Sequence, residues 1–225
     1  MRAVVFDFDG TIANTIPALR TAVNRALEEL GFPTHTDEEV RTYVNYGSRE
    51  MVRRALPAER REDQGLIDRA TELYNKYGAE ACFITKEPYP GVGELFLRLK
   101  QKEYAIGVLS NKHDPVLQKI TPAILPKGSF DAIQGVAPGL PTKPDPALTL
   151  RILEKLGVDA KDAVFVGDSE IDLFTAENAG LYHIGVTWGY KDEADLIAAG
   201  AKHLAHTAEE LETLIEKHFS EGQYD

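Results

Sequence analysis

The sequence of 225 residues contains a single cysteine, Cys82. An internal disulfide is therefore excluded, and such low cysteine usage is typical of proteins in a reducing cytosol. No apolar run approaches the roughly 20 residues that a helix needs to cross a bilayer. The N-terminus does not have the pattern of a secretory signal, because only four apolar residues lie between Arg2 and Asp7. We therefore expect a cytoplasmic protein without a membrane partner.

Basic residues are scarce relative to acidic ones. Lys and Arg number 25 against 36 Asp and Glu, which gives a net charge of −11. Such a chain is a poor candidate for nonspecific binding to the phosphates of nucleic acid, so we expect no nucleic-acid partner. A small phosphorylated metabolite is not excluded, because a bound divalent cation and a few basic side chains can reverse the local field. We expect a monomer or a homodimer.

Hydrophobic residues make up 43% of the chain, enough for a sizeable core in one large domain or two modest ones. Residues 3–8, AVVFDF, predict a short buried strand. The chain then has helical patterns from about residue 15 to residue 85. Helices are expected over 16–30, after a capping box at 36–39, after the candidate cap Ser48, and along 66–77.

Strand-like and helix-like segments alternate from Pro88 onward. Strands are expected at 104–109, 131–136, 163–167 and 182–186, and helices at 92–102, 115–124, 146–156, 170–179 and after residue 207. This alternation predicts an α/β fold, a Rossmann-like doubly wound parallel sheet. The first strand must join that sheet to satisfy its backbone. The domains are then an α/β core of residues 1–14 and 87–225, and an inserted helical domain of residues 15–86. Disorder is expected only over the last residues, 220–225.

Acidic residues follow two of the predicted strands. The first strand ends in the segment DFDGT (7–11), and period-two geometry places Asp7 and Asp9 on the same side. The strand at 163–167 leads into Asp168 and Asp172, four residues apart at the start of a helix, so both carboxylates can point the same way. A turn at Asp9 and a dipole effect in the first helical turn are the competing explanations. Four carboxylates at neighbouring strand ends would suit Mg²⁺.

Two further segments carry groups that suit an anion. Ser110 and Asn111 follow the strand at 104–109, where a hydroxyl and exposed N–H groups can bind phosphate, although Ser110 can also be a plain helix cap. Lys143 lies in a proline-rich loop, and a lysine held near acids can neutralise a transferring phosphoryl group. These residues are candidate substrate ligands.

The four motifs together resemble those of the haloacid dehalogenase-like hydrolases, in particular the phosphoglycolate phosphatase-like branch with a helical cap. They occur in the order DFDGT (7–11), SN (110–111), KPDP (143–146) and GDSEIDLFTAENAG (167–180). The segments VTWGY (186–190) and LIAAGA (196–201) are also similar to that branch. The resemblance spans nearly the whole chain, and the order of all four motifs makes it specific.

The resemblance implies a magnesium-dependent phosphatase that forms an aspartyl-phosphate. Asp7 would be the nucleophile, and Asp9 the acid toward the leaving alcohol and then the base toward water. Mg²⁺ would be held by Asp7, Asp168 and the Asp9 backbone carbonyl, with Asp172 as an outer ligand or a partner of Lys143. Ser110, Asn111 and Lys143 would bind the phosphoryl oxygens.

Other activities share parts of this pattern. Carbon–halogen hydrolysis requires neither the acid at Asp9 nor a metal, and a phosphonatase would require a lysine from the cap. A phosphosugar mutase of the same superfamily shares the acid pair and is the main alternative. A non-catalytic phosphate-binding or signalling protein could carry the same acids, but a helical insertion is useful chiefly to close over a substrate.

The cap would select the substrate. The segment Asn45–Arg49 falls between two predicted cap helices, where Gly47 allows a tight turn and Arg49 could bind a carboxylate or phosphate bidentately. A solvated arginine at a helix start is the alternative. The resemblance makes 2-phosphoglycolate, or a similar small phosphate monoester, the first substrate to consider.

Overall fold

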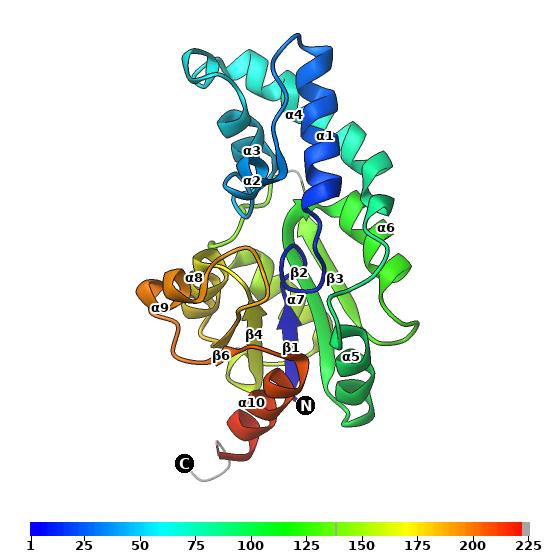
Figure 1. The fold of residues 1–225 in the computed structure, drawn as a ribbon. Helices are drawn as coiled ribbons and strands as arrows, with labels where there is room; N and C mark the ends of the chain where they lie inside the picture. Colours follow the sequence, from blue (N-terminus) through cyan, green and yellow to red (C-terminus); the bar gives the residue numbers. More distant parts are fainter. Residues whose placement is uncertain (138, 222–225) are drawn as a thin grey trace.

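The computed structural model describes residues 1–137 and 139–221. A six-stranded sheet lies at its centre in the order β3-β2-β1-β4-β5-β6, and every neighbouring pair is parallel (Figure 1). The strands are β1 (Ala3–Phe6), β2 (Ala105–His113), β3 (Ala132–Val136), β4 (Ala163–Gly167), β5 (Tyr182–Val186) and β6 (Leu204–Ala205). The chain builds outward from β1 to β3 and then from β4 to β6, so the topological switch lies between β1 and β4.

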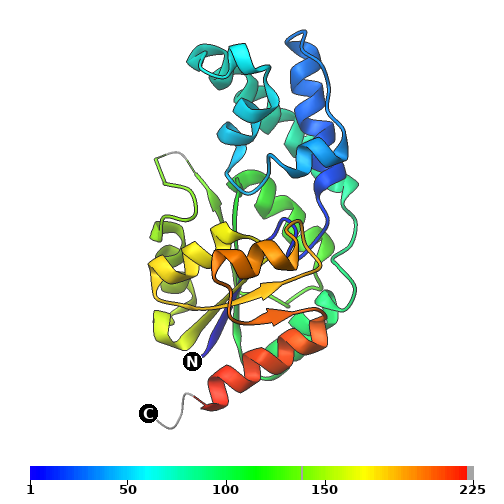
Figure 2. The same cartoon turned by 60° about the vertical axis from the view of Figure 1, so that its left-hand side comes forward.

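The residues of β1 alternate between two hydrophobic cores, one on each face of the sheet. Val4 and Phe6 belong to the first core, and Ala3 and Val5 to the second. Helices cover both faces (Figure 2). The first core is covered by α5 (Val92–Gln101), α6 (Asp114–Ile124) and α10 (Ala208–Glu221), and the second by α7 (Ala147–Leu156) and α8 (Glu170–Ala179). A short helix, α9 (Glu193–Ala199), connects β5 to β6.

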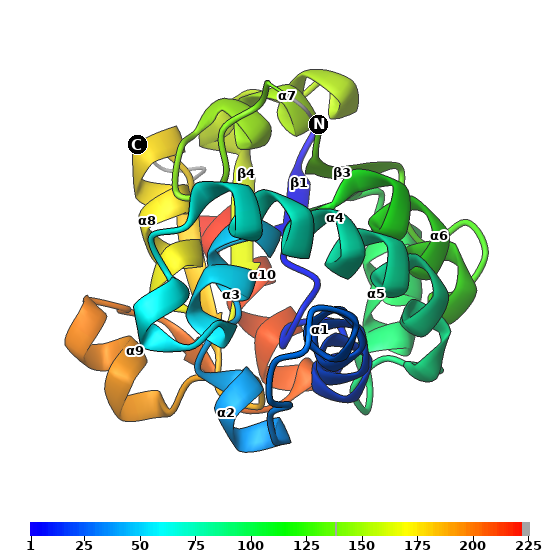
Figure 3. The ribbon, with the colours of Figure 1, turned by 90° about the horizontal axis from the view of Figure 1, so that it is seen from above.

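Four of the helices between β1 and β2 lie over the carboxyl ends of the strands (Figures 1 and 3). They are α1 (Ile16–Glu29), α2 (Asp37–Arg41), α3 (Ser48–Ala55) and α4 (Gln64–Ala81). The four helices share a third hydrophobic core, to which each contributes a fully buried residue: Val23, Val40, Val52 and Ile67. Tyr190, which follows β5, is also part of this core. The helices therefore have a core of their own over the sheet edge where sites form in parallel α/β folds.

The fold class predicted from the sequence is confirmed. β4, α8 and β5 have the predicted bounds, but β1 ends at Phe6, and β2 continues to His113. The extension of β2 arises because its pairing with β3 resumes at His113 after an irregularity. α9 and β6 were not predicted.

The sequence predictions also differ at two termini. Ser48 is the first residue of α3 rather than its cap, since Gly47 occupies the cap position. At the C-terminus, α10 includes Ser220, and residues 222–225, where disorder was expected, lie outside the described residues. Within residues 1–137 and 139–221, no helix combines the length and the apolar character that a bilayer span requires.

Candidate active site

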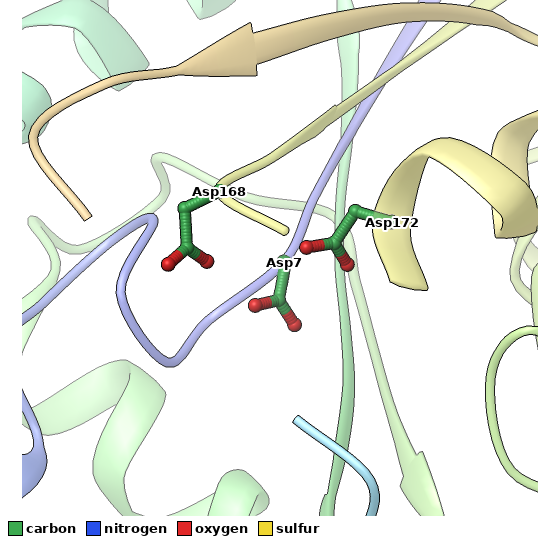
Figure 4. A group of neighbouring side chains, drawn as sticks. All are labelled: Asp7, Asp168 and Asp172. Carbon is green, nitrogen blue, oxygen red and sulfur yellow. The ribbon is translucent and has the colours of Figure 1, made fainter. Parts of the chain in front are cut away.

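Three carboxylates meet beside the topological switch. Asp7 directly follows β1, Asp168 directly follows β4, and Asp172 lies in the first turn of α8. One oxygen of each lies within 4.8 Å of the others (Figure 4). They are almost fully buried, with 3%, 0% and 1% of their surface exposed. This is the only such group of possible metal ligands among the described residues.

Lys143 joins two of these carboxylates. Its Nζ lies 2.7 Å from Oδ1 of Asp7 and 2.6 Å from Oδ1 of Asp172. Asn111 holds the backbone of this lysine, because its Oδ1 accepts from Lys143 N at 2.7 Å and its Nδ2 donates to Lys143 O at 3.1 Å. The ammonium is therefore fixed in the loop between β3 and α7 and directed at the acids.

The electrostatics of this group favour a cation. The pKa of Asp7 is raised to about 7, because burial, together with the nearby Asp172 and Asp9, outweighs the attraction of Lys143. Burial, Asp172 and Asp7 also raise the pKa of Asp168 well above its ordinary value. Burial alone would lower the pKa of Lys143, but Asp172 and Asp7 raise it. One ammonium thus faces three buried acids, and the remaining negative charge suits a hard divalent cation such as Mg²⁺.

Hydrogen bonds orient the acids that follow β4. Oδ2 of Asp172 accepts from Ser169 N at 3.1 Å and Ser169 Oγ at 2.6 Å, so both of its oxygens are engaged. Asp168 accepts from Thr11 Oγ1 at 3.2 Å and Tyr190 N at 2.7 Å. By contrast, no hydrogen bond from a described residue reaches Oδ2 of Asp7. Asp7 is therefore the acid of this group that keeps an oxygen for another partner.

Glycines allow the backbone to approach these acids closely. A Cβ at Gly10 or at Gly189 would lie 2.3 Å from an atom of Asp168, and a Cβ at Gly167 would lie 2.2 Å from Asp172. Gly10 also has a φ of +87°, which an L side chain rarely adopts. These positions accordingly require glycine.

Asp9 lies apart from the three-carboxylate group. Its Oδ1 is 2.9 Å from Lys112 Nζ and accepts a hydrogen bond from Thr15 Oγ1, and its Oδ2 accepts from Ser110 Oγ at 3.4 Å. The structure therefore brings together three of the four acids expected at one site, and it gives Asp9 separate polar partners. Both Asp7 and Asp9 line the same cavity.

Sequence reasoning did not assign roles to Lys112, Thr15 or Tyr190. The hydroxyl of Tyr190 accepts from Thr15 N at 2.8 Å and lies 2.9 Å from Thr15 Oγ1. A signal existed for two of them, since Lys112 directly follows the SN motif and Tyr190 ends VTWGY. Thr15 carried none.

The loop before α3 reaches the site, but Arg49 does not. Asn45 O accepts from Asn111 Nδ2 at 2.8 Å, and Asn45, Gly47 and Ser48 line the cavity. Arg49 is not among the lining residues; its Nη2 binds Asp68 at 2.9 Å and Gln64 at 2.8 Å, and its side chain is 48% exposed. One helical residue corresponds to a rotation of about 100°, which turns Arg49 away when Ser48 faces the cavity. Arg49 thus has the alternative position expected from the sequence, a largely solvated arginine near a helix start, and its role as a substrate ligand stays a prediction.

The cavity above Asp7 and Asp9 has a volume of about 760 Å³, including the part open to solvent. It is bounded below by Ser110, Lys112 and Lys143, and above by residues of α1, α3 and α4. A group bound there would be close to both acids and enclosed by the helices. The arrangement can bind a phosphate monoester and shield it from bulk water.

Comparison with known proteins agrees with this geometry. The family model described as "Haloacid dehalogenase-like hydrolase" matches residues 4–186. The phosphoglycolate phosphatase of Yersinia pestis is 32% identical over 191 residues, which cover 84% of this chain and 82% of that protein. The phosphoglycolate phosphatase of Vibrio parahaemolyticus is 29% identical over 221 residues, 94% of each chain. A crystal structure of a candidate phosphoglycolate phosphatase from Lactobacillus delbrueckii is 34% identical, covers 96% of this chain and 99% of that one, and has a TM-score of 0.87.

Proposed function

This chain belongs to the haloacid dehalogenase-like hydrolases and is a phosphoric monoester hydrolase, and we propose that it hydrolyses a small phosphate ester with Mg²⁺ through an aspartyl-phosphate on Asp7. The observation that carries the proposal is the placement of Asp7, with one oxygen bound to Lys143, among buried acids at the floor of the cavity. Because the similar proteins from Yersinia pestis and Vibrio parahaemolyticus are phosphoglycolate phosphatases by name, 2-phosphoglycolate is the first compound to test.

Asp7 is the proposed nucleophile. Its carboxylate oxygen attacks phosphorus, the bond from phosphorus to the alcohol oxygen breaks, and the phosphoryl group becomes attached to Asp7. Covalent transfer divides one difficult displacement into two easier ones. The contact between Lys143 and Oδ1 supports this role, because it orients the carboxylate and favours its ionised form.

Asp9 is the proposed acid and base. It gives a proton to the departing alcohol, and its carboxylate then takes a proton from the water that attacks phosphorus and releases inorganic phosphate from Asp7. Contacts with Lys112, Thr15 and Ser110 support this role, since they fix the side chain at the cavity wall. Ser110 and Lys143 are the proposed ligands of the phosphoryl oxygens, and Asn111 positions Lys143.

Mg²⁺ would be held by Asp7, Asp168 and the backbone carbonyl of Asp9, with Asp172 engaged by Lys143 and Ser169. A bound Mg²⁺ would offset the charge of the phosphoryl oxygens and lower the pKa of Asp7. The raised pKa values of Asp7 and Asp168 support this assignment. We also propose that residues 15–86 act as a cap over the substrate, as the separate core of α1 to α4 supports.

The test combines metal removal with substitution of the nucleophile. The protein stripped of metal should lose turnover of p-nitrophenyl phosphate and regain it with Mg²⁺.

Asp7→Asn should abolish turnover with an unchanged fold, because the amide changes almost no volume. Rapid acid quenching of the wild type during turnover should give a peptide containing Asp7 with the added mass of one phosphoryl group. Full turnover in excess chelator would refute the metal requirement, and near-normal turnover by Asp7→Asn would refute the covalent step.

A further inference from the structure

The upper walls of the cavity are predominantly apolar. α1, α3, α4 and the start of α6 each present one stripe of residues at helical spacing. The apolar members include Leu19, Met51, Tyr74, Val116 and Ile120. A two-carbon alcohol such as glycolate would leave much of these walls uncovered. The walls suit a leaving alcohol that has a longer carbon chain.

The described residues that line the cavity offer no free cation for a second anion. Lys143 is bound to Asp7 and Asp172, and Lys112 is bound to Asp9. His113 is the remaining basic side chain of the lining, and burial lowers its pKa. A carboxylate on the alcohol would therefore enter an apolar region without a partner of opposite charge, which is unfavourable.

Two buried amide atoms of the cavity lining lack a partner among the described residues. They are Nδ2 of Asn45, a donor, and Oδ1 of Asn75, an acceptor. Buried polar atoms are normally satisfied, so each requires a hydrogen-bonding group from outside the chain. A hydroxyl both donates and accepts, and can therefore pair with either atom.

Gly78 gives an independent indication that space is kept for a ligand. It lies within α4 on the cavity side, four residues from Tyr74. A Cβ at Gly78 would meet no heavy atom within 4 Å, and its φ is not in the left-handed region. Glycine in a helix interior makes the helix less stable than alanine would, so helix stability does not explain the glycine at this position. The absent side chain leaves room next to Asn75.

We propose that this cavity selects phosphate esters of uncharged, hydroxyl-bearing alcohols longer than two carbons, with Asn45 and Asn75 binding the hydroxyl groups and Gly78 leaving room for the chain. The proposal rests on the phosphatase function proposed above and specifies its substrate class. This substrate class differs from 2-phosphoglycolate, because glycolate has only two carbons and carries a carboxylate. The free N–H groups at the start of α3, beside Gly47, are the main alternative ligand for such a carboxylate.

Four esters separate chain length from charge. The short pair is 2-hydroxyethyl phosphate and 2-phosphoglycolate, and the long pair is 5-hydroxypentyl phosphate and 4-carboxybutyl phosphate. With Mg²⁺ present, kcat/KM should be highest for 5-hydroxypentyl phosphate. It should exceed that of the carboxylate of equal length by at least about tenfold. A preference for either carboxylate over its neutral partner would overturn the proposal and favour the α3 N-terminus.

Substitutions at Gly78 and Asn75 test the two residues separately. Gly78→Leu should lower the ratio of kcat/KM for 5-hydroxypentyl phosphate to that for 2-hydroxyethyl phosphate by roughly tenfold, because the new side chain fills the space. Gly65→Leu is the matched control, since Gly65 is an exposed residue of the same helix outside the cavity. Asn75→Leu should lower kcat/KM for 5-hydroxypentyl phosphate relative to n-pentyl phosphate by about three- to tenfold. Unchanged ratios in both variants would overturn the proposal.

Binding to Asp7→Asn distinguishes failure of this proposal from failure of the proposed function. Calorimetry with this variant measures the affinity of each ester without turnover. If wild-type protein hydrolyses none of the esters, the proposed function fails, yet a preference of Asp7→Asn for the long hydroxylated ester would still uphold the selectivity of the cavity. Equal affinity for all four esters would overturn the selectivity whatever the turnover shows.

Discussion

Tyr190 connects three parts of the molecule through one side chain and its own backbone. Its N–H donates to Asp168, its hydroxyl binds Thr15, and its ring packs in the core of α1 to α4. Thr15 in turn donates to Asp9. The orientation of the proposed acid and base therefore depends on Tyr190 through Thr15.

We predict that Tyr190→Phe impairs the acid function of Asp9 selectively. The substitution leaves the buried N–H of Thr15 without its acceptor, which costs about 1–3 kcal/mol, and it frees the hydroxyl of Thr15 from one partner. An alkyl phosphate requires a proton on its leaving oxygen, whereas p-nitrophenolate departs readily without one. kcat/KM for the alkyl ester should fall roughly tenfold more than that for p-nitrophenyl phosphate.

The ratio of the two kcat/KM values is the decisive measurement, because it reports the first phosphoryl transfer and not the later attack by water. A general loss of folded protein would lower both values together. If Tyr190→Phe lowers them by the same factor, Tyr190 only stabilises the fold.

The residues of the site were predictable from the sequence to different degrees. Asp7, Asp168 and Asp172 were found because strand ends converge at one edge of a parallel sheet. Lys143 was found instead from its proline-rich loop and from the family motif KPDP. Asp9 was expected among the acids, but its partners are Lys112, which lies in the part of β2 that was not predicted, and Thr15, which lies beyond β1. Sequence spacing thus predicts where an acid lies more reliably than it predicts which side chains contact that acid.

At the scale of elements, the rotation of α3 determines which of its residues reach the cavity. Ser48 and Met51 line the cavity, whereas Arg49 faces the beginning of α4. The sequence predicts that a helix starts near Ser48, but the face that packs inward follows from its contacts with α4 in the shared core. A one-residue difference in the helix start therefore changes the inferred ligand.

We predict that Arg49→Ala leaves substrate selection unchanged. The side chain is about half exposed and pairs with Asp68, and exposed pairs contribute about 0–1 kcal/mol. KM for 2-phosphoglycolate relative to p-nitrophenyl phosphate should stay within about twofold of wild type, and the free energy of unfolding within about 0.5 kcal/mol. A tenfold rise in that relative KM would restore Arg49 as a substrate ligand and require α3 to rotate when substrate binds.

The elements themselves were predicted best where the pattern was long or fully buried. β4 is buried at every position and α8 is bounded by Ser169 and Gly180, so both had clear limits. α9 has seven residues and β6 has two, too few for periodicity to distinguish them from loops. β2 was predicted to end at residue 109, because SNKH is polar while its backbone remains extended.

At the scale of the whole molecule, a buried histidine makes stability depend on pH. His183 lies in β5, and neither ring nitrogen has a hydrogen-bond partner among the described residues. Burial lowers its pKa to about 4, although Asp172 acts in the opposite direction. The unfolded chain binds a proton at His183 below about pH 6.5, whereas the folded chain does so only near pH 4. The neutral form is therefore the one that the fold stabilises.

We predict that acid lowers the free energy of unfolding partly through His183. The loss should begin near pH 6.5, be complete near pH 4, and reach roughly 3 kcal/mol. His183→Leu stays neutral, so its unfolding free energy, measured by urea denaturation, should decrease less than that of wild type over this range. The two proteins should have parallel profiles above pH 7. Parallel profiles down to pH 4 would mean that His183 is not the responsible group.

The chain enters and leaves the helical segment α1 to α4 at neighbouring points. Tyr89 N donates to Ile12 O at 2.8 Å, and Thr85 Oγ1 donates to Asn14 O at 3.4 Å. The two ends of this long insertion are therefore as close together as the ends of a tight loop. The two hydrogen bonds hold these ends together. The junction is consequently a natural site for recombination: a helical segment from another chain with equally close ends could be grafted there, which would change the leaving-alcohol cavity and leave the register of the six strands intact.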